Sequence, residues 1–206
     1  MTQPTLERFL DDVKHHELTI HQNNGVYRHL TFKKPFTYDM HFNITTVPGY
    51  LMITGDMGTL VFFRCEDMFR FFRSDELLIN PSYWGEKIQS TTYEAKDVSF
   101  LEFDIDDVKN LAQEELDDFL IDNELSNEDE GKLRDEFRRK ILCSKNELEI
   151  REAVNNFSCN GFDFEEFWGV ESRKYRYHYI WLCYAIVWGI KKFDELNQDG
   201  KNHDRT

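Results

Sequence analysis

The sequence predicts an α+β protein in which an N-terminal helix is followed by an antiparallel β meander and then by a mostly helical C-terminal half. Three observations carry this prediction. Apolar residues recur at helical spacing in residues 5–17, they alternate with polar residues between 39 and 64, and the helical spacing returns from residue 104 onward. Strands gathered in one run and helices gathered in another are typical of α+β folds, whereas a parallel sheet requires the two to alternate.

Residues 5–17 form the predicted first helix. Its apolar residues share one face at i, i+3, i+4, i+7 spacing: Leu6, Phe9, Leu10 and Val13. A short β-like run at 18–20 follows, and the Asn-Asn-Gly sequence at 23–25 is a turn signal. Residues 26–32 are then the expected partner strand of that run.

The clearest alternation of the chain comes next. Residues 40–46, 50–54 and 59–63 are predicted to form three antiparallel strands. Between the first two, Pro48 and Gly49 occupy the i+1 and i+2 positions that a type II turn prefers. Between the last two, a Gly-Asp-Met-Gly sequence allows a tight connection, because glycine adopts positive φ without a steric penalty.

Two short helices are predicted after the meander. The first opens at residues 65–67 and carries an apolar stripe of Met68, Phe71 and Phe72. The Asn-Pro sequence at 80–81 breaks the chain, and residues 82–90 are predicted to form the second short helix.

The most regular helical period begins at Asp104, whose side chain is suited to cap the helix. The apolar face is the following set: Ile105, Val108, Leu111, Ala112, Leu116, Phe119 and Leu120. A polar loop is expected at 123–130, followed by helices at 132–142 and 145–157. The Asn-Gly pair at 160–161 is expected to end the second of these.

A short turn is predicted at 163–168 and a last helix at 172–196, which is apolar nearly all round in its middle and therefore expected to be buried. The polar tail at 197–206 is expected to fray. The longest apolar run covers 12 residues, whereas a membrane-spanning helix needs about 20. The start of the chain is a charged helix rather than a signal peptide. We therefore expect a single cytoplasmic domain over residues 1–206, with no membrane span.

Two cysteine features support the same compartment. The four cysteines stand at 65, 143, 159 and 183, with no pair at CxxC spacing and no histidine at metal-finger spacing. Reduced, buried thiols of a cytosolic protein are the expectation.

The charge of the chain is concentrated in one segment. The whole chain carries a net charge of −14, which argues against direct binding of nucleic acid. Residues 1–74 are neutral and residues 132–206 carry +1, whereas residues 75–131 hold 18 acidic and 3 basic residues, a net charge of −15. The basic residues of this acidic segment are Lys87, Lys96 and Lys109.

No motif of established chemistry accompanies this charge. The sequences GxGxxG, GxxxxGK[ST], GxSxG and HExxH are all absent. His15, His16 and His21 lie near one another but are interpreted as ordinary surface histidines, and Asp56 as a turn former. The alternation of basic and aromatic residues at 173–179 is interpreted as core tyrosines with extended Arg and Lys side chains. We predict no catalytic residue, no metal ligand and no cofactor.

One enzyme alternative stays open. Glu102, Asp104, Asp106 and Asp107 supply the carboxylate oxygens that Mg²⁺ prefers, and Lys109 is near them in sequence. A metal-dependent nuclease would combine such acids with a lysine on adjoining strands, although Lys109 falls within the predicted helix.

The acidic helix suggests a binding surface instead. Residues three and four apart on a helix lie about 5–6 Å apart, which is of the order of the phosphate spacing of a nucleic acid. The predicted partner-binding residues are these: Asp104, Asp106, Asp107, Glu114, Glu115, Asp117, Asp118 and Asp122. The alternative is a solvated face that serves solubility alone.

Three stretches of the chain carry a resemblance to a known family. They are VPGYLMITGDMGT continuing to DMFRFFR, then INPSYW, and YHYIWLCYAIVWGI. Together they resemble a family of phage and prophage proteins without established function, over residues 27 to 193. One departure is Val47, where the family pattern has Trp before Pro-Gly. The family supplies no catalytic residues, and the matching residues are turns, strands and the buried helix.

The resemblance implies a small phage accessory protein present in the host cytoplasm during infection or lysogeny. With the local acidity, it leads us to expect an inhibitor of a host nucleic-acid-binding defence complex, such as a CRISPR effector or a restriction enzyme. The expected partner is a host protein complex with a basic nucleic-acid channel, met through a DNA-mimicking surface. The alternatives are a small phage enzyme and a structural, self-associating phage protein, with a homodimer among the open oligomeric states.

Overall fold

The chain consists of two compact units, each with its own hydrophobic core. Unit 1 comprises residues 1–100 and 175–206, and unit 2 comprises residues 101–174. The segment boundaries drawn from charge, at 74 and 131, fall inside these units. The computed structural model describes residues 3–91, 100–165 and 167–203. Lys96 of the acidic segment therefore lies outside the described residues.

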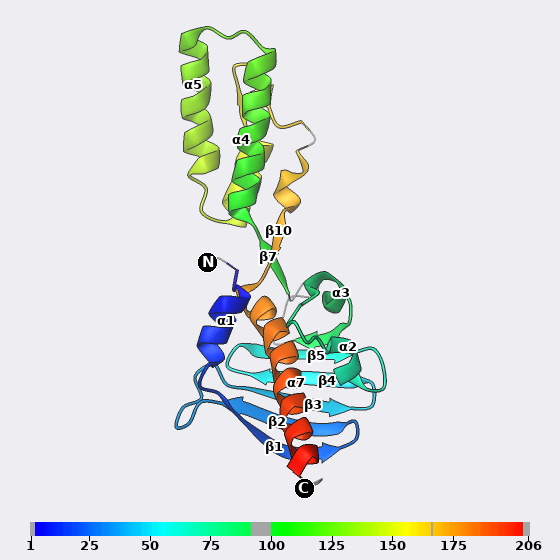
Figure 1. The fold of residues 1–206 in the computed structure, drawn as a ribbon. Coiled ribbons are helices and arrows are strands. Elements are labelled where there is room, and N and C mark those ends of the chain that lie inside the picture. The colour runs from blue at the N-terminus through cyan, green and yellow to red at the C-terminus, as the bar shows by residue number, and fades with distance from the viewer. Residues whose placement is uncertain (1–2, 92–99, 166, 204–206) are drawn as a thin grey trace. The chain divides into compact units, whose positions relative to one another are not determined.

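Unit 1 contains a six-stranded antiparallel sheet in the order β1-β2-β3-β4-β5-β6 (Figure 1). The strands are β1 (Glu17–Asn24), β2 (Tyr27–Lys33), β3 (Phe42–Val47), β4 (Tyr50–Gly55), β5 (Gly58–Phe63) and β6 (Ile88–Thr91). The predicted meander is confirmed and continues into the two strands before it. Gly49, with φ of +85°, sits in the two-residue connection between β3 and β4, as a type II turn requires at i+2.

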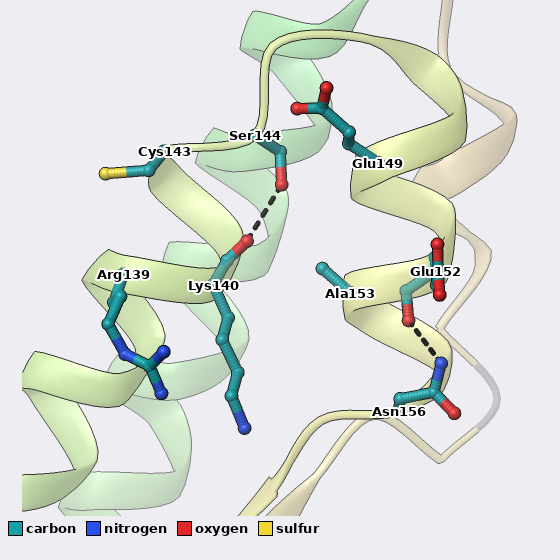
Figure 2. A pocket seen from close by; sticks show the side chains of 8 residues that line it. All are labelled: Arg139, Lys140, Cys143, Ser144, Glu149, Glu152, Ala153 and Asn156. Atoms are coloured by element: carbon teal, nitrogen blue, oxygen red, sulfur yellow. Dashed lines mark hydrogen bonds between the residues drawn. The ribbon is translucent and has the colours of Figure 1, made fainter.

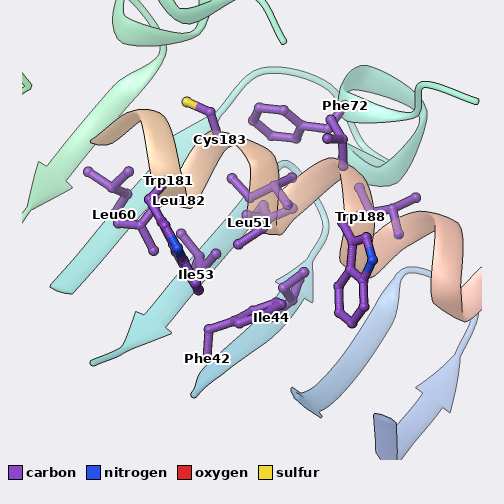
Figure 3. Packing of buried hydrophobic residues seen from close by; sticks show 14 of the residues in the cluster. Phe42, Ile44, Leu51, Ile53, Leu60, Phe72, Trp181, Leu182, Cys183 and Trp188 are labelled. Carbon is purple, nitrogen blue, oxygen red and sulfur yellow. The ribbon is translucent and has the colours of Figure 1, made fainter. Parts of the chain in front are cut away.

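One face of the sheet carries the core of unit 1. Alternate residues along its strands are buried on that face: Leu30, Phe32, Phe42, Ile44, Leu51, Ile53, Leu60 and Phe62. Helix α7 (Tyr177–His203) lies across them, and Trp181, Leu182 and Trp188 pack against the strands (Figures 1 and 3). Each such side chain contributes about 1.5–3 kcal/mol through burial. The predicted burial of the middle of the last helix is confirmed.

Helix α1 (Leu6–Val13) packs beside α7. The Thr5 hydroxyl caps it by accepting from Arg8 N at 3.2 Å, and the indole N–H of Trp181 donates to Asp12 Oδ2 at 3.1 Å. The helix ends before residue 17, where the sequence predicted its end, because Glu17 already pairs with Lys33 in the sheet.

Two short helices, α2 (Met68–Phe72) and α3 (Pro81–Gly85), connect β5 to β6. The sequence predicted a helix over 82–90, and this was wrong for its second half. There β6 pairs with β5, and Phe63 N donates to Lys87 O. Strand alternation cannot be recognised in a segment of four residues. The strand conformation of β6 comes from hydrogen bonding to the otherwise open edge of β5.

Unit 2 is mostly helical. Its helices are α4 (Ile105–Asp122), α5 (Asn127–Phe137), the π-helical turn η1 (Arg138–Leu142), α6 (Glu147–Asn155) and the 3₁₀ turn η2 (Trp168–Glu171). It also contains the antiparallel pair β8 (Ser158–Cys159) with β9 (Phe162–Asp163). A further two-stranded sheet pairs β7 (Leu101–Phe103) with β10 (Arg173–Tyr175). The α4 and α5 helices run side by side (Figure 1).

Four boundaries in the C-terminal half differ from the prediction. The expected loop at 123–130 is half helical, because Ser126 caps α5 by accepting from Asp129 N. The Asn-Gly pair at 160–161 forms the β8–β9 turn rather than ending a helix. The strand β10 replaces the predicted start of the last helix, and α7 continues to His203 through much of the tail expected to fray. Among the described residues, no helix is both long and apolar enough to cross a membrane.

Candidate functional site

The predicted acidic residues fall into two groups on α4. The carboxylates of the first group form hydrogen bonds or ion pairs with other residues of unit 2. Asp104 caps the helix at Asp107 N and pairs with Lys174 at 3.1 Å, and Asp107 accepts a hydrogen bond from the Ser172 hydroxyl. Asp117 accepts from Arg134 at 3.5 Å. These three carboxylates contact neighbouring parts of unit 2, and the charges of Asp104 and Asp117 are partly neutralised by Lys174 and Arg134.

The second group has no such partner. Asp106, Glu114, Glu115, Asp118 and Asp122 form no ion pair with any Lys or Arg of the described chain. Three of them, Glu115, Asp118 and Asp122, follow the i, i+3, i+7 spacing and share one face of α4. Of the predicted residues, these three therefore share one helix face and have no ion-pair partner in the described chain.

The hairpin β8–β9 brings two further carboxylates to the same face. Asp163 and Glu165 line, with Glu115, Asp118 and Asp122, a groove of about 500 Å³. Phe119, Gly161 and Phe162 form the rest of its lining. We call this the acidic groove. Its five carboxylates come from two parts of the chain about forty residues apart, and none is paired within the described residues.

Aromatic packing fixes the hairpin against α4. The rings of Phe119 and Phe162 lie 5.2 Å apart between centroids, and Phe162 also contacts Phe157 at 5.8 Å. Asn160 and Gly161 adopt φ of +48° and +84°, the pair of positive values that a type I′ hairpin turn needs. The local sequence thus folds so that Asp163 and Glu165 line the same groove as the helix carboxylates.

The groove is electrostatically strained. Partial burial raises the pKa of Glu115 above its ordinary value, because a desolvated carboxylate is less favourable in the charged form. Like charges at i, i+3 and i+4 positions also repel one another. A cationic group placed in the groove would relieve both effects.

Sequence reasoning missed Asp163 and Glu165. They lie outside the segment selected for its charge, and Asn160-Gly161 was interpreted as a helix end. The signal that could have found them is the Asn-Gly pair between alternating residues, with Phe157 and Cys159 before it and Phe162 and Phe164 after it. That pattern is the strongest short-range indication of a hairpin.

The carboxylates considered for a Mg²⁺ site do not come together. In the portion of the chain that the structure describes, no three His, Cys, Asp or Glu side chains are placed to hold a metal ion. Lys109, the candidate nuclease lysine, donates to the backbone oxygen of Ser144 at 2.6 Å. Asp106 and Asp107 are on α4 rather than on adjoining strands.

The three histidines occupy different surroundings. His15 is exposed, whereas His16 is half-buried with Nε2 3.0 Å from Met40 O, and burial lowers its pKa. His21 is exposed and lies 2.9 Å from the Thr31 hydroxyl. Asp56, in the connection between β4 and β5, accepts a hydrogen bond from Met40 N in the segment before β3.

The basic and aromatic segment at 173–179 is divided between structural roles. Arg173 pairs with Glu147 at 3.2 Å and Lys174 pairs with Asp104. The Tyr179 side chain is buried in the core of unit 1, and burial raises its pKa. Tyr179 is thus a core tyrosine as interpreted, whereas Tyr175 and Tyr177 are only partly buried, and Arg173 and Lys174 form ion pairs.

A second depression in unit 2 lies between η1 and α6 and measures about 380 Å³ (Figure 2). Its charges are largely satisfied. Arg139 and Lys140 both pair with Glu136, while Glu149 accepts from Lys145 N and from the Asn146 side chain. Cys143 lines it, but its sulfur points away from α6 in Figure 2. Compared with this depression, the acidic groove therefore has more charge that is left unpaired within the described residues.

Comparisons with protein-family models, with curated proteins and with solved structures find no match to this chain.

Proposed function

We propose that the chain is an accessory protein that acts by binding a partner protein, with the acidic groove docking onto a basic surface that otherwise holds nucleic acid. The observation that carries the proposal is the set of five carboxylates around one groove, none of them paired within the described residues. Solubility alone requires exposed charge, but it does not require carboxylates from a helix and from a hairpin to line the same groove.

The spacing of these carboxylates supports mimicry of a phosphate backbone. Glu115, Asp118 and Asp122 lie on successive turns of one helix face, where the Cβ atoms of neighbouring residues are about 5–6 Å apart. A nucleic-acid strand carries a charge about every 3.4 Å of its axis. A channel lined by Arg and Lys can therefore meet the groove at several points, and complementary potentials raise the rate of association.

The resemblance to phage proteins gives the proposal its biological setting. A phage gains from blocking host complexes that recognise nucleic acid, and a CRISPR effector or a restriction enzyme has the required basic channel. We therefore propose an inhibitor of such a defence complex as the function of this chain.

The test begins with a pull-down from cells that carry defence systems, followed by DNA competition with the purified partner. The chain should displace DNA, and displacement should weaken as salt concentration rises. A groove variant (Glu115→Gln, Asp118→Asn, Asp122→Asn, Asp163→Asn and Glu165→Gln) should lose most of this activity.

A matched variant controls for net charge. It neutralises three aspartates and two glutamates that are exposed outside the groove: Glu17, Asp39, Asp75, Glu76 and Asp135. This control should compete almost as well as the unaltered chain. If the two variants lose competition equally, or if neither does, the acidic groove is not the binding surface.

A further inference from the structure

Unit 1 contains a groove of about 820 Å³ with the opposite charge character. It lies where the chain leaves β5 and passes through α2 to α3. Arg64 and Arg70 line it together with the rings of Phe71 and Tyr83. We call it the cationic groove. Its volume falls within the range of about 300–1,000 Å³ typical of small-molecule sites.

The two arginines of this groove are unpaired. Arg64 and Arg70 are both exposed, and neither forms an ion pair with a described acidic residue. In the same unit, Arg28 holds Asp67 at 2.8 Å and Arg73 holds Asp194 at 2.7 Å. Guanidinium groups left free beside a groove are suited to bidentate binding of phosphate.

The acidic residues of the groove do not cancel this charge. Asp67 is neutralised by Arg28 and also accepts from Phe69 N at 3.1 Å. The charge of the exposed Glu66 offsets the charge of one of the two free arginines. The free charges of the groove therefore sum to a positive value.

Aromatic rings form another part of the wall. Phe71 and Tyr83 lie 5.7 Å apart between centroids, and 38% of Tyr83 is exposed. Lys87 lies 4.5 Å from the centre of the Tyr83 ring and is itself paired with Glu86. Aromatic side chains of this kind bind the planar part of a ligand by stacking or edge contacts.

Backbone hydrogen bonds hold the wall in place. Arg64 N donates to Gly49 O at 3.1 Å, and Gly49 N donates to Glu66 O at 3.0 Å. Asn80 accepts from Tyr83 N at 3.2 Å and so caps α3. The groove is thus formed before any ligand arrives, which reduces the entropy lost on binding.

We propose that the cationic groove binds a nucleoside phosphate, with Arg64 and Arg70 holding the phosphate and Phe71 and Tyr83 contacting the base. This proposal does not rest on the acidic groove, which belongs to unit 2. Variants of one groove should leave binding at the other unchanged.

The experiment measures dissociation constants of the full chain by titration calorimetry. The probes are the four ribonucleoside 5′-monophosphates, inorganic phosphate and adenosine. At least one mononucleotide should bind at least tenfold more tightly than either phosphate or adenosine. Equal affinity for inorganic phosphate, equal affinity for adenosine, or no binding of any mononucleotide at millimolar concentration would each overturn the proposal.

Two variants separate the contributions. Replacement of both arginines (Arg64→Gln with Arg70→Gln) should weaken mononucleotide binding at least tenfold. Tyr83→Ser should weaken mononucleotide binding while leaving phosphate binding unchanged. The control is Arg138→Gln, because Arg138 is also exposed and without an ion pair in the described chain but lies on η1. If Arg138→Gln has the same effect as the double replacement, the binding is non-specific attraction and the site is refuted.

Discussion

Arg28 and Asp67 form a bidentate ion pair that joins the sheet to helix α2. Arg28 Nη1 lies 2.8 Å from Asp67 Oδ1 and Nη2 lies 3.2 Å from Oδ2, and the same carboxylate caps α2 at Phe69 N. The Arg28 side chain is only 10% exposed, and its guanidinium also lies 4.3 Å from the centre of the Phe69 ring. Asp67 therefore neutralises the buried Arg28 guanidinium and also caps the N-terminus of α2.

We predict that Asp67→Asn lowers the free energy of unfolding by about 3 kcal/mol, because it leaves the Arg28 charge buried without its counter-ion. Urea unfolding at neutral pH measures this loss. Asp39→Asn is the control, since Asp39 is exposed and makes no ion pair within the described chain. If Asp67→Asn lowers the free energy of unfolding no more than Asp39→Asn does, solvent rather than Asp67 stabilises the Arg28 charge.

The same pair predicts a dependence on pH. Burial opposes ionisation of Asp67, but the hydrogen bonds and charge of Arg28, with the Phe69 N–H, outweigh it and hold the pKa below its ordinary value of 3.8. A depressed carboxyl pKa stabilises the native state above the unfolded pKa, and this stabilisation is lost as pH falls through the folded pKa. The unaltered chain should therefore lose stability below about pH 4 more steeply than Asp67→Asn does.

Gly189 on α7 tests the close packing of that helix on the sheet. A Cβ there would lie 2.8 Å from Ile44 Cδ1 and 3.1 Å from Phe32 Cζ. We expect Gly189→Val to lower the free energy of unfolding by about 1–3 kcal/mol through overpacking. The control is Gly131→Ala on α5, where a Cβ meets nothing within 4 Å; there the better helix propensity should raise stability by about 0.5–1 kcal/mol. Thermal and urea unfolding of the two variants should move in opposite directions.

The sequence was most informative where one physical signal dominates a long segment. Alternation over β3 to β5 and the helical period of α4 both depend on many residues that face one core, so their predictions were confirmed. The strand β6 could not be predicted, because its four residues are strand-like only through pairing with β5.

The site shows the same limit. Local charge identified Glu115, Asp118 and Asp122, and the sequence also marked Asp104 as a helix cap, but no local property shows that Lys174, from a distant part of the chain, neutralises Asp104. Asp163 and Glu165 reach the groove only because the Phe162 ring packs on Phe119. Contacts between segments decide which acidic residues are available, and such contacts are not a property of any one segment.

Glu115 offers a test of strain in the acidic groove. Its pKa is raised by burial, so the native state binds this proton more readily than the unfolded state does. Stability should therefore rise as pH is lowered from neutral toward the raised pKa of Glu115. We expect Glu115→Gln to raise the melting temperature at pH 7. The same variant should show a smaller gain in stability when the pH is lowered. Glu114→Gln, at the exposed neighbouring position, is the control and should do neither; identical curves for the two variants would contradict strain at Glu115.

The β8–β9 turn links folding to the proposed function. Gly161 has φ of +84°, and a Cβ there meets nothing within 4 Å, so Gly161→Val strains the backbone without a clash, at a cost of about 1–2 kcal/mol. Relief of that strain should move Asp163 and Glu165 away from α4 and weaken partner binding about as much as neutralising both carboxylates. Gly25→Val is the matched control, because Gly25 has φ of +62°, equally open space and a place in the β1–β2 turn of unit 1. Gly25→Val should cost similar stability while leaving partner affinity and its salt dependence intact. If both glycine variants reduce affinity equally, general destabilisation explains the loss and the hairpin carboxylates do not contribute to binding.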